Sequence, residues 1–135
     1  MSKATNKQII QQVLADIAEG KGDTFLSALA EDVVFEMPKY PVDVLKIESC
    51  YQGKERTLEL LGLIDELFDT LVFEPRVFIA ENDKVAVLLY EKARAKITGK
   101  EFEQEFVQIW TLRNGKIVHC KLSEDTYAIV EASRT

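Results

Sequence analysis

The fold of this 135-residue chain is decided by residues 85–122, VAVLLYEKARAKITGKEFEQEFVQIWTLRNGKIVHCKL. Apolar and polar residues alternate in three segments of this stretch, which predicts β-strands at 85–95, 102–112 and 117–122. Asn114 and Gly115 separate the last two segments, and this pair strongly indicates a hairpin because both central residues of a type I′ turn have positive φ. The stretch is therefore expected to form an antiparallel meander.

Helices are expected ahead of the meander. Apolar side chains recur at helical spacing over residues 5–19 and again over 54–68. A short helix between them can be capped by Asp23 or Thr24, and Glu31 with Asp32 is expected to close it.

Two further strands and an irregular segment complete the chain before the meander. Residues 33–37 are predicted to be a strand, and residues 38–51 a long irregular segment of the kind that often forms a pocket wall. Residues 72–80 are predicted to be an edge strand because Pro75 lacks an N–H donor.

The order of these elements indicates an α+β fold. Asp125 can cap a short terminal helix that runs to Ala132. Three N-terminal helices are then expected to pack on a curved antiparallel β-sheet and to enclose a cavity with it.

Length and composition point to a single domain over residues 1–135, with 47% hydrophobic residues to build a core. The net charge of -6 disfavours nucleic acid and anionic membranes as partners. Residues 1–8 are polar and lack the apolar core of a signal peptide, so we expect a cytoplasmic protein. Cys50 and Cys120 lack metal-type spacing and only one histidine is present, so we expect no metal and no cofactor.

Four short motifs carry a resemblance to a known family over most of the chain. They are Glu19-Gly20-Lys21-Gly22-Asp23, Glu31-Asp32-Val33-Val34-Phe35, Tyr51-Gln52-Gly53-Lys54-Glu55, and residues 110–118 followed by Asp125. With these motifs the chain resembles SnoaL-like and ketosteroid-isomerase-related proteins of the nuclear-transport-factor-2-like superfamily. The resemblance implies the cone-shaped form of the α+β fold.

The same resemblance implies three catalytic positions, and this chain departs from the family pattern at each. Steroid isomerases of this fold carry an Asp base where this chain has Met37. Their oxyanion hole uses a Tyr where this chain has Val13 and a protonated Asp where it has Gln108. Ketosteroid isomerase chemistry by that mechanism is therefore not expected.

Strand alternation predicts which side chains of the meander face the cavity. The inner set comprises Val85, Val87, Leu89, Glu91, Gln104, Phe106, Gln108, Trp110, Leu112, Cys120, Leu122 and Glu124. His119 and Tyr90 then belong to the outer face. Because large side chains would otherwise be exposed there, we expect a homodimer to form through that face.

Glu91, Gln108 and Glu124 are the candidate catalytic residues. A carboxyl group in an apolar pocket has a raised pKa and can exchange protons near neutral pH, and a nearby amide can orient a carbonyl group. Each residue also has a structural interpretation. Glu91 can be a rim charge or part of a cross-strand ion pair, Gln108 a satisfied buried amide, and Glu124 a residue that favours the last helix.

Five other residues are candidate ligand contacts: Met37, Tyr40, Leu89, Trp110 and Cys120. Trp110 and Cys120 can equally be core residues, and Tyr40 an ordinary loop aromatic. The first predicted function is a cofactor-independent isomerase, cyclase or lyase that transfers a proton on a small apolar carbonyl compound. The alternative is a non-catalytic binding or accessory protein that uses the same cavity. A buried carboxyl group would favour the first, and the missing isomerase residues favour the second.

Overall fold

The computed structural model describes residues 4–135, so the first three residues of the polar N-terminal segment lie outside it. The helices of this range are α1 (Asn6–Ala18), α2 (Gly22–Ala28), α3 (Lys54–Leu67) and α4 (Thr126–Ser133). The strands are β1 (Leu29–Glu36), β2 (Cys50–Gln52), β3 (Phe68–Glu81), β4 (Lys84–Ala95), β5 (Glu101–Arg113) and β6 (Lys116–Ser123). They form one sheet in the order β2-β1-β6-β5-β4-β3, and the expected α+β class is confirmed.

The predicted meander is present as β4, β5 and β6, with each strand pairing antiparallel to the next. Asn114 and Gly115 have φ values of 52° and 76°, as a type I′ turn requires. The expected edge strand is also found, since β3 pairs only with β4 and its register shifts beside Pro75. The alternation is confirmed too, because the inner residues of β5 from Gln104 to Leu112 are buried.

The sheet differs from the expectation of an entirely antiparallel one, because β1 lies parallel to β6. Parallel pairing joins segments that are far apart in the chain, and no local pattern reveals it. The same pairing extends β1 back to Leu29, so Glu31 and Asp32 lie in the strand and do not close α2 as expected.

The start of α2 also differs from the prediction. The helix begins at Gly22 after Lys21, and no side chain caps it. Asp23 lies in the first turn, where its negative charge is favourable at the helix N-terminus. The caps of α1 and α4 follow the usual chemistry, since the Thr5 and Asp125 side chains accept backbone N–H groups at their starts, whereas α3 begins after Gly53 without a side-chain cap.

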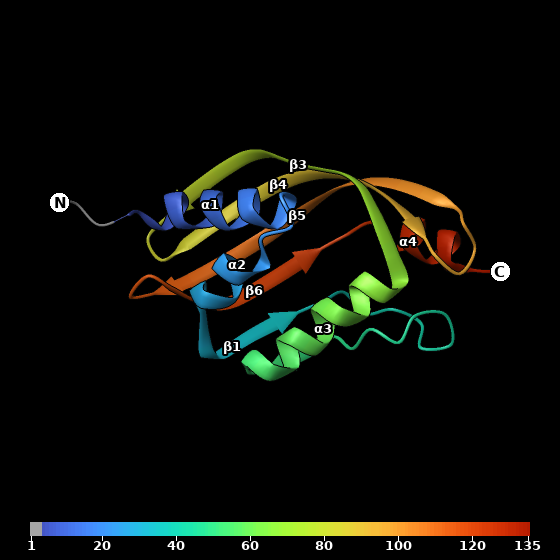
Figure 1. The fold of residues 1–135 in the computed structure, drawn as a ribbon, viewed down its shortest axis with the longest axis horizontal. Coiled ribbons are helices and arrows are strands. Elements are labelled where there is room, and N and C mark those ends of the chain that lie inside the picture. Colours follow the sequence, from blue (N-terminus) through green and yellow to red (C-terminus); the bar gives the residue numbers. More distant parts are fainter. Residues whose placement is uncertain (1–3) are drawn as a thin grey trace.

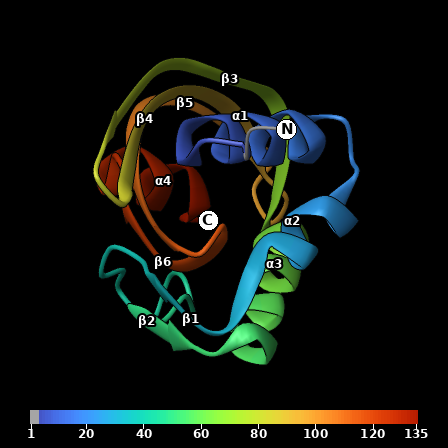
Figure 2. The same cartoon turned by 90° about the vertical axis from the view of Figure 1, so that its left-hand side faces the viewer.

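The helices lie against the concave side of the sheet. Figure 1 shows α1 along β3 and β4, α3 crossing below, and α4 near the opposite end. Seen end-on in Figure 2, the sheet curls around α1 while α2 and α3 border its open side. No helix among residues 4–135 is long and apolar enough to cross a membrane.

Aromatic side chains dominate the centre of the core. Phe25 from α2, Phe35 from β1 and Trp110 from β5 meet edge to face, with ring centroids 5.9–6.2 Å apart. A smaller cluster of Leu45, Ile129 and Val130 packs α4 against the segment that follows β1. Helix α4 therefore closes one end of the space beneath the sheet.

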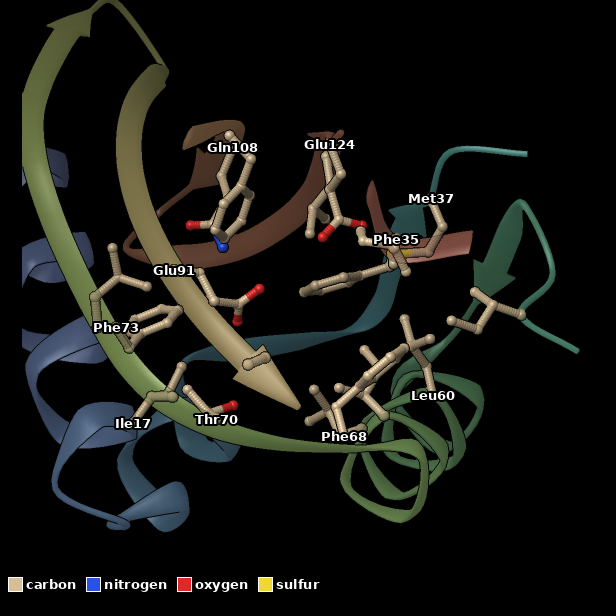
Figure 3. A pocket seen from close by; sticks show the side chains of 18 of the residues that line it. Ile17, Phe35, Met37, Leu60, Phe68, Thr70, Phe73, Glu91, Gln108 and Glu124 are labelled. Carbon is tan, nitrogen blue, oxygen red and sulfur yellow. The ribbon is translucent and has the colours of Figure 1, made fainter. Parts of the chain in front are cut away.

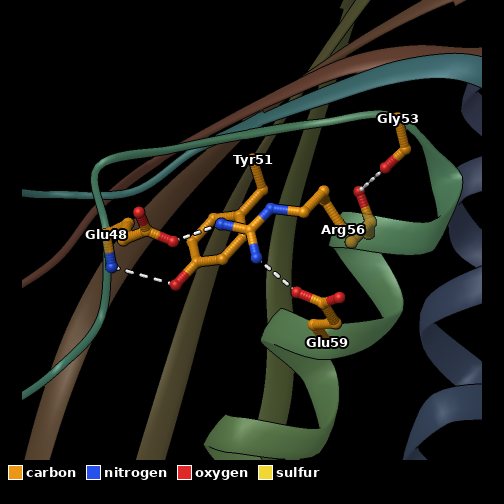
Figure 4. A network of polar contacts seen from close by, with 6 residues as sticks. Glu48, Tyr51, Gly53, Arg56 and Glu59 are labelled. Atoms are coloured by element: carbon orange, nitrogen blue, oxygen red, sulfur yellow. Dashed lines mark hydrogen bonds and ion pairs between the residues drawn. The ribbon is translucent and has the colours of Figure 1, made fainter.

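Tyr51 anchors that segment to the rest of the fold, as Figure 4 shows. It belongs to β2, which is too short for its alternation to be recognised within the predicted irregular segment. The buried Tyr51 hydroxyl accepts the Glu48 backbone N–H at 2.9 Å. The Arg56 guanidinium lies 5.0 Å from the Tyr51 ring centroid and pairs with the Glu48 and Glu59 carboxylates. These contacts hold the segment against α3.

Tyr51→Phe tests this anchor. The substitution keeps the buried ring but leaves the Glu48 N–H without its acceptor, so the free energy of unfolding should fall by about 1–2 kcal/mol. Urea denaturation followed by circular dichroism measures the change. Tyr127→Phe is the matched control, because Tyr127 is 76% exposed. Equal stability of the two variants would contradict an anchoring role for the Tyr51 hydroxyl.

Candidate functional site

A cavity of about 350 Å³ lies between the helices and the concave face of the sheet. This volume falls in the range of small-molecule sites. Its wall is largely aromatic and apolar, and Figure 3 shows the side chains that project into it from several elements. The aromatic lining residues are Phe25, Phe35, Tyr40, Phe68, Phe73, Phe102, Phe106 and Trp110.

Two acidic side chains, Glu91 from β4 and Glu124 from the segment after β6, interrupt this apolar wall (Figure 3). A third residue, Gln104, lies opposite Glu91 in the β4–β5 register. Its side-chain Nε2 donates to Glu91 Oε1 at 3.0 Å and to Glu124 Oε2 at 3.2 Å. One amide group therefore joins the two carboxyl groups.

The orientation of that amide is determined by the backbone. Gln104 is only 4% exposed, and its Oε1 accepts the Asp125 N–H at 2.9 Å. Because a backbone N–H can only donate, the amide oxygen must face Asp125 and the NH₂ group must face the acids. On the other side, the Tyr40 hydroxyl donates to Glu124 Oε1 at 2.9 Å. Tyr40 thus brings the segment after β1 into the same hydrogen-bonded chain.

Burial controls the proton affinity of both acids. Desolvation raises the pKa of Glu91, the Gln104 hydrogen bond opposes the rise, and the charge of Glu124 adds to it. Desolvation also raises the pKa of Glu124, against hydrogen bonds from Tyr40 and Gln104. The pKa of Tyr40 is strongly raised as well, by burial and by the neighbouring Glu124 charge, so its hydroxyl remains a donor.

The two acids differ in their hydrogen bonds. Both oxygens of Glu124 accept a donor, from Tyr40 and from Gln104. For Glu91, only Oε1 accepts a hydrogen bond from a side chain or backbone group within residues 4–135. Glu91 Oε2 is therefore the one oxygen of the two carboxyl groups without a hydrogen-bond partner within residues 4–135.

Gln108 supplies a hydrogen-bond donor to the cavity farther along β5, away from the two acids. Its Oε1 accepts the Trp110 indole N–H at 3.0 Å, and since that N–H can only donate, the amide NH₂ must face away from the ring. This NH₂ group donates to no atom of the described chain. Gln108 lies four residues from Gln104 on the same face of β5, roughly 13 Å along the strand. A ligand can therefore lie between this donor and the acids.

Six of the eight residues predicted for the site line the cavity: Met37, Tyr40, Glu91, Gln108, Trp110 and Glu124. Leu89 and Cys120 do not line it, and both are fully buried in the packed core. Cys120 lies in register between Phe35 and Trp110, which both line the cavity. Burial raises the pKa of its thiol well above the ordinary value.

The contacts of Glu91 and Glu124 are not those of a rim charge, a cross-strand ion pair or a residue that only favours the last helix. The cross-strand partner of Glu91 is the Gln104 amide, not a cation. The cap of α4 is Asp125, while Glu124 turns into the cavity. His119 does not line the cavity and pairs with Glu36 at 2.5 Å, as its outward alternation implies.

Gln104 is the residue that the sequence analysis placed on the inner face without giving it a role. The position of Gln104 opposite Glu91 in the predicted hairpin could have indicated their hydrogen bond. Its contact with Glu124 could not be predicted, because it depends on where β6 ends. Within residues 4–135, no group of three or more His, Cys, Asp and Glu side chains is placed to hold a metal ion.

The curled sheet, its helices and the enclosed cavity define a class of small α+β cavity proteins. A family model for the SnoaL-like domain matches residues 10–120, so the chain belongs to the SnoaL-like domain family. A comparison with curated proteins found no match.

Solved structures share the fold. An NTF2-like protein from Burkholderia xenovorans LB400 is 25% identical, with a TM-score of 0.81 over 98% of this chain and 100% of that chain. TerC, co-crystallised with polyporic acid, is 23% identical with a TM-score of 0.81 over 94% and 96% of the two chains. A protein described as a SnoaL-like polyketide cyclase from Mesorhizobium loti is 16% identical, with a TM-score of 0.75 over 89% and 99%.

Gln104→Met tests the shared amide. The substitution keeps the length of the side chain but removes the donor to both carboxylates, so the pKa of Glu91 and of Glu124 should rise further. Carbon-13 NMR titration of the glutamate carboxyl carbons measures both values, with Glu91→Gln and Glu124→Gln to assign the signals. The exposed Gln11→Met is the control. Unchanged titration of the two carboxyl groups in Gln104→Met would show that the amide does not act on them.

Proposed function

We propose that this protein is a cofactor-independent enzyme that transfers a proton on a small apolar carbonyl compound, as isomerases and cyclases do. The observation that carries the proposal is the pair of buried acids, Glu91 and Glu124, joined by one amide inside an apolar cavity. Paired acids with unequal surroundings are typical of sites that take up and return protons. Solved neighbours described as a polyketide cyclase and an isomerase share this fold, which supports the choice of reaction class.

Glu91 is the proposed proton carrier. Its ionised carboxylate would take a proton from a carbon next to the carbonyl group, and the electrons of that C–H bond would move to the carbonyl oxygen. The Gln108 NH₂ group would donate to this oxygen as its charge develops. Glu91 would then return the proton to a carbon of the same compound, so that no co-reactant is consumed.

Glu124 and Tyr40 would act through Glu91. The negative charge of Glu124 makes ionised Glu91 a stronger base, and the Tyr40 hydroxyl holds Glu124 in place. Burial adds to the basicity of Glu91 because it disfavours the charged form. A carboxyl group whose pKa is raised towards neutrality is suited to general acid–base catalysis.

A second candidate function is ligand binding without catalysis. It is favoured by the three positions where the chain departs from steroid isomerases. Val13 is buried in the core, and Met37 and Gln108 line the cavity without a carboxyl group. Under this alternative the Tyr40–Glu124–Gln104–Glu91 chain would only position the wall of a binding cavity.

Deuterium exchange distinguishes the two functions. The probe is 2-acetylnaphthalene in D₂O, whose methyl protons are acidic, and ¹H NMR follows their loss. Wild-type protein should accelerate the exchange, and Glu91→Gln should lower that acceleration at least about 100-fold. Glu55→Gln on the exposed surface of α3 should leave it unchanged. Exchange that is no faster with protein than in buffer would support the binding function instead.

We also propose that the protein is a cytoplasmic homodimer. Its two cysteines are free thiols, which suits a reducing compartment. An apolar stripe crosses the outer face of β3, β4 and β5 and comprises Val77, Ile79, Ala86, Leu88, Val107 and Ile109. Neighbouring charges of both signs are already paired, as in Arg76 with Glu74 and Glu105. A second copy can therefore cover the stripe without net repulsion.

Ile109→Lys tests the dimer. A charge within the stripe would be buried without a partner, so the variant should sediment as a monomer while wild-type protein sediments as a dimer. Ile97→Lys, in the exposed turn between β4 and β5, is the control. Sedimentation velocity measures all three proteins. A dimer that persists in Ile109→Lys would place the interface elsewhere.

A further inference from the structure

The cavity holds negative groups without a positive counter-charge. Glu91 and Glu124 are the only charged side chains among its lining residues, and no Lys, Arg or His of residues 4–135 joins them. Strand alternation explains the separation. Lys92 and Arg94 alternate with Glu91 and Ala93 along β4. They therefore point to the outer face, where both pair with Glu101.

A ligand anion would meet unfavourable conditions in this cavity. It would leave water for an apolar wall, and no cation would compensate the loss of hydration. It would also lie near two carboxyl groups in a medium where charges interact strongly. A neutral ligand of the same shape escapes both costs.

Two polar groups of the wall without a partner in residues 4–135, the Gln108 NH₂ group and Glu91 Oε2, favour a neutral ligand with an acceptor oxygen. The Gln108 NH₂ group is turned away from Trp110 and needs an acceptor. Glu91 Oε2 can accept a hydrogen bond when ionised and donate one when protonated. Both groups suit a carbonyl compound.

A cationic ligand fits less well, although the acids and aromatic rings would attract it. The Gln108 NH₂ group is a donor, so it has no favourable contact to offer an ammonium group. Each oxygen of Glu124 already accepts one hydrogen bond, from Tyr40 and from Gln104, so Glu124 has less acceptor capacity left for an ammonium group than Glu91. The ammonium would also lose its hydration on entry.

We propose that the cavity selects its ligands by charge: it binds uncharged carbonyl compounds and excludes compounds that carry a carboxylate or phosphate. This inference names the ligand class of the proposed enzyme and rests on the same cavity, but it does not require that any reaction occur. The negative charges of Glu91 and Glu124 disfavour an anion in the cavity. No Lys, Arg or His of residues 4–135 lines the cavity to offset these charges.

Three probes with the same ring system test the selection. They are 2-acetylnaphthalene, 2-naphthoate and 2-(aminomethyl)naphthalene, which are neutral, anionic and cationic at pH 7.5. Isothermal titration calorimetry should show that the ketone binds at least about 10-fold more tightly than the carboxylate, which corresponds to about 1.4 kcal/mol. The ketone should also bind more tightly than the amine.

Variants then assign the selection to the acids. In Glu91→Gln/Glu124→Gln the gap between ketone and carboxylate should shrink at least about 10-fold, and in Glu55→Gln it should persist. Thermal unfolding establishes that the double variant is folded, and if it is not, the comparison of the probes on wild-type protein alone decides.

The outcomes separate this inference from the proposed function. Equal or tighter binding of 2-naphthoate, tighter binding of the amine, or no binding of the ketone would each overturn charge selection. Ketone binding with the expected charge preference but without deuterium exchange would uphold charge selection and refute the proton transfer.

Discussion

The hydrogen-bonded register between β4 and β5 is the constraint on which the cavity depends. It places Glu91 opposite Gln104 and, further along, Val85 opposite Trp110. A slip of one residue in β4 would turn Glu91 outward, away from Gln104, and bring Lys92 inward, because successive side chains of a strand point to opposite faces. The apolar inner residues of β4, Val85, Val87 and Leu89, oppose such a slip, since it would turn them outward. The packing of the core therefore also holds the acids in position.

The polar chain from Tyr40 through Glu124 and Gln104 to Glu91 joins parts of the chain that are distant in sequence. It comes at a cost to the fold. Burial raises both carboxyl pKa values, so the folded state binds protons more tightly than the unfolded chain. The two acids therefore destabilise the protein increasingly as the pH rises through their folded-state pKa values, and cease to do so below the ordinary pKa of Glu. An apolar pair would avoid this cost, which is consistent with a functional role.

Membership of the SnoaL-like family fixes the architecture but not the chemistry, because one fold can carry many different sites. The cavity of this chain lacks the acids of the steroid isomerases at Met37 and Gln108, and it has others at Glu91 and Glu124. The chemistry proposed for this cavity therefore depends on these residues and their hydrogen bonds. Glu91 Oε2 and the oriented NH₂ group of Gln108 are polar groups of this wall that have no hydrogen-bond partner within residues 4–135.

The sequence by itself determined the meander, its turns and the inward direction of Glu91, Gln108 and Glu124, because alternation and turn chemistry are local properties of the chain. It could not reveal the parallel β1–β6 pairing, the bounds of α2 or the contact of Tyr40 with Glu124 across 84 positions. Nor could it show that Leu89 and Cys120 are covered while Met37 and Trp110 reach the cavity. Those distinctions depend on how helices and distant strands pack over the sheet, and only the tertiary structure decided them.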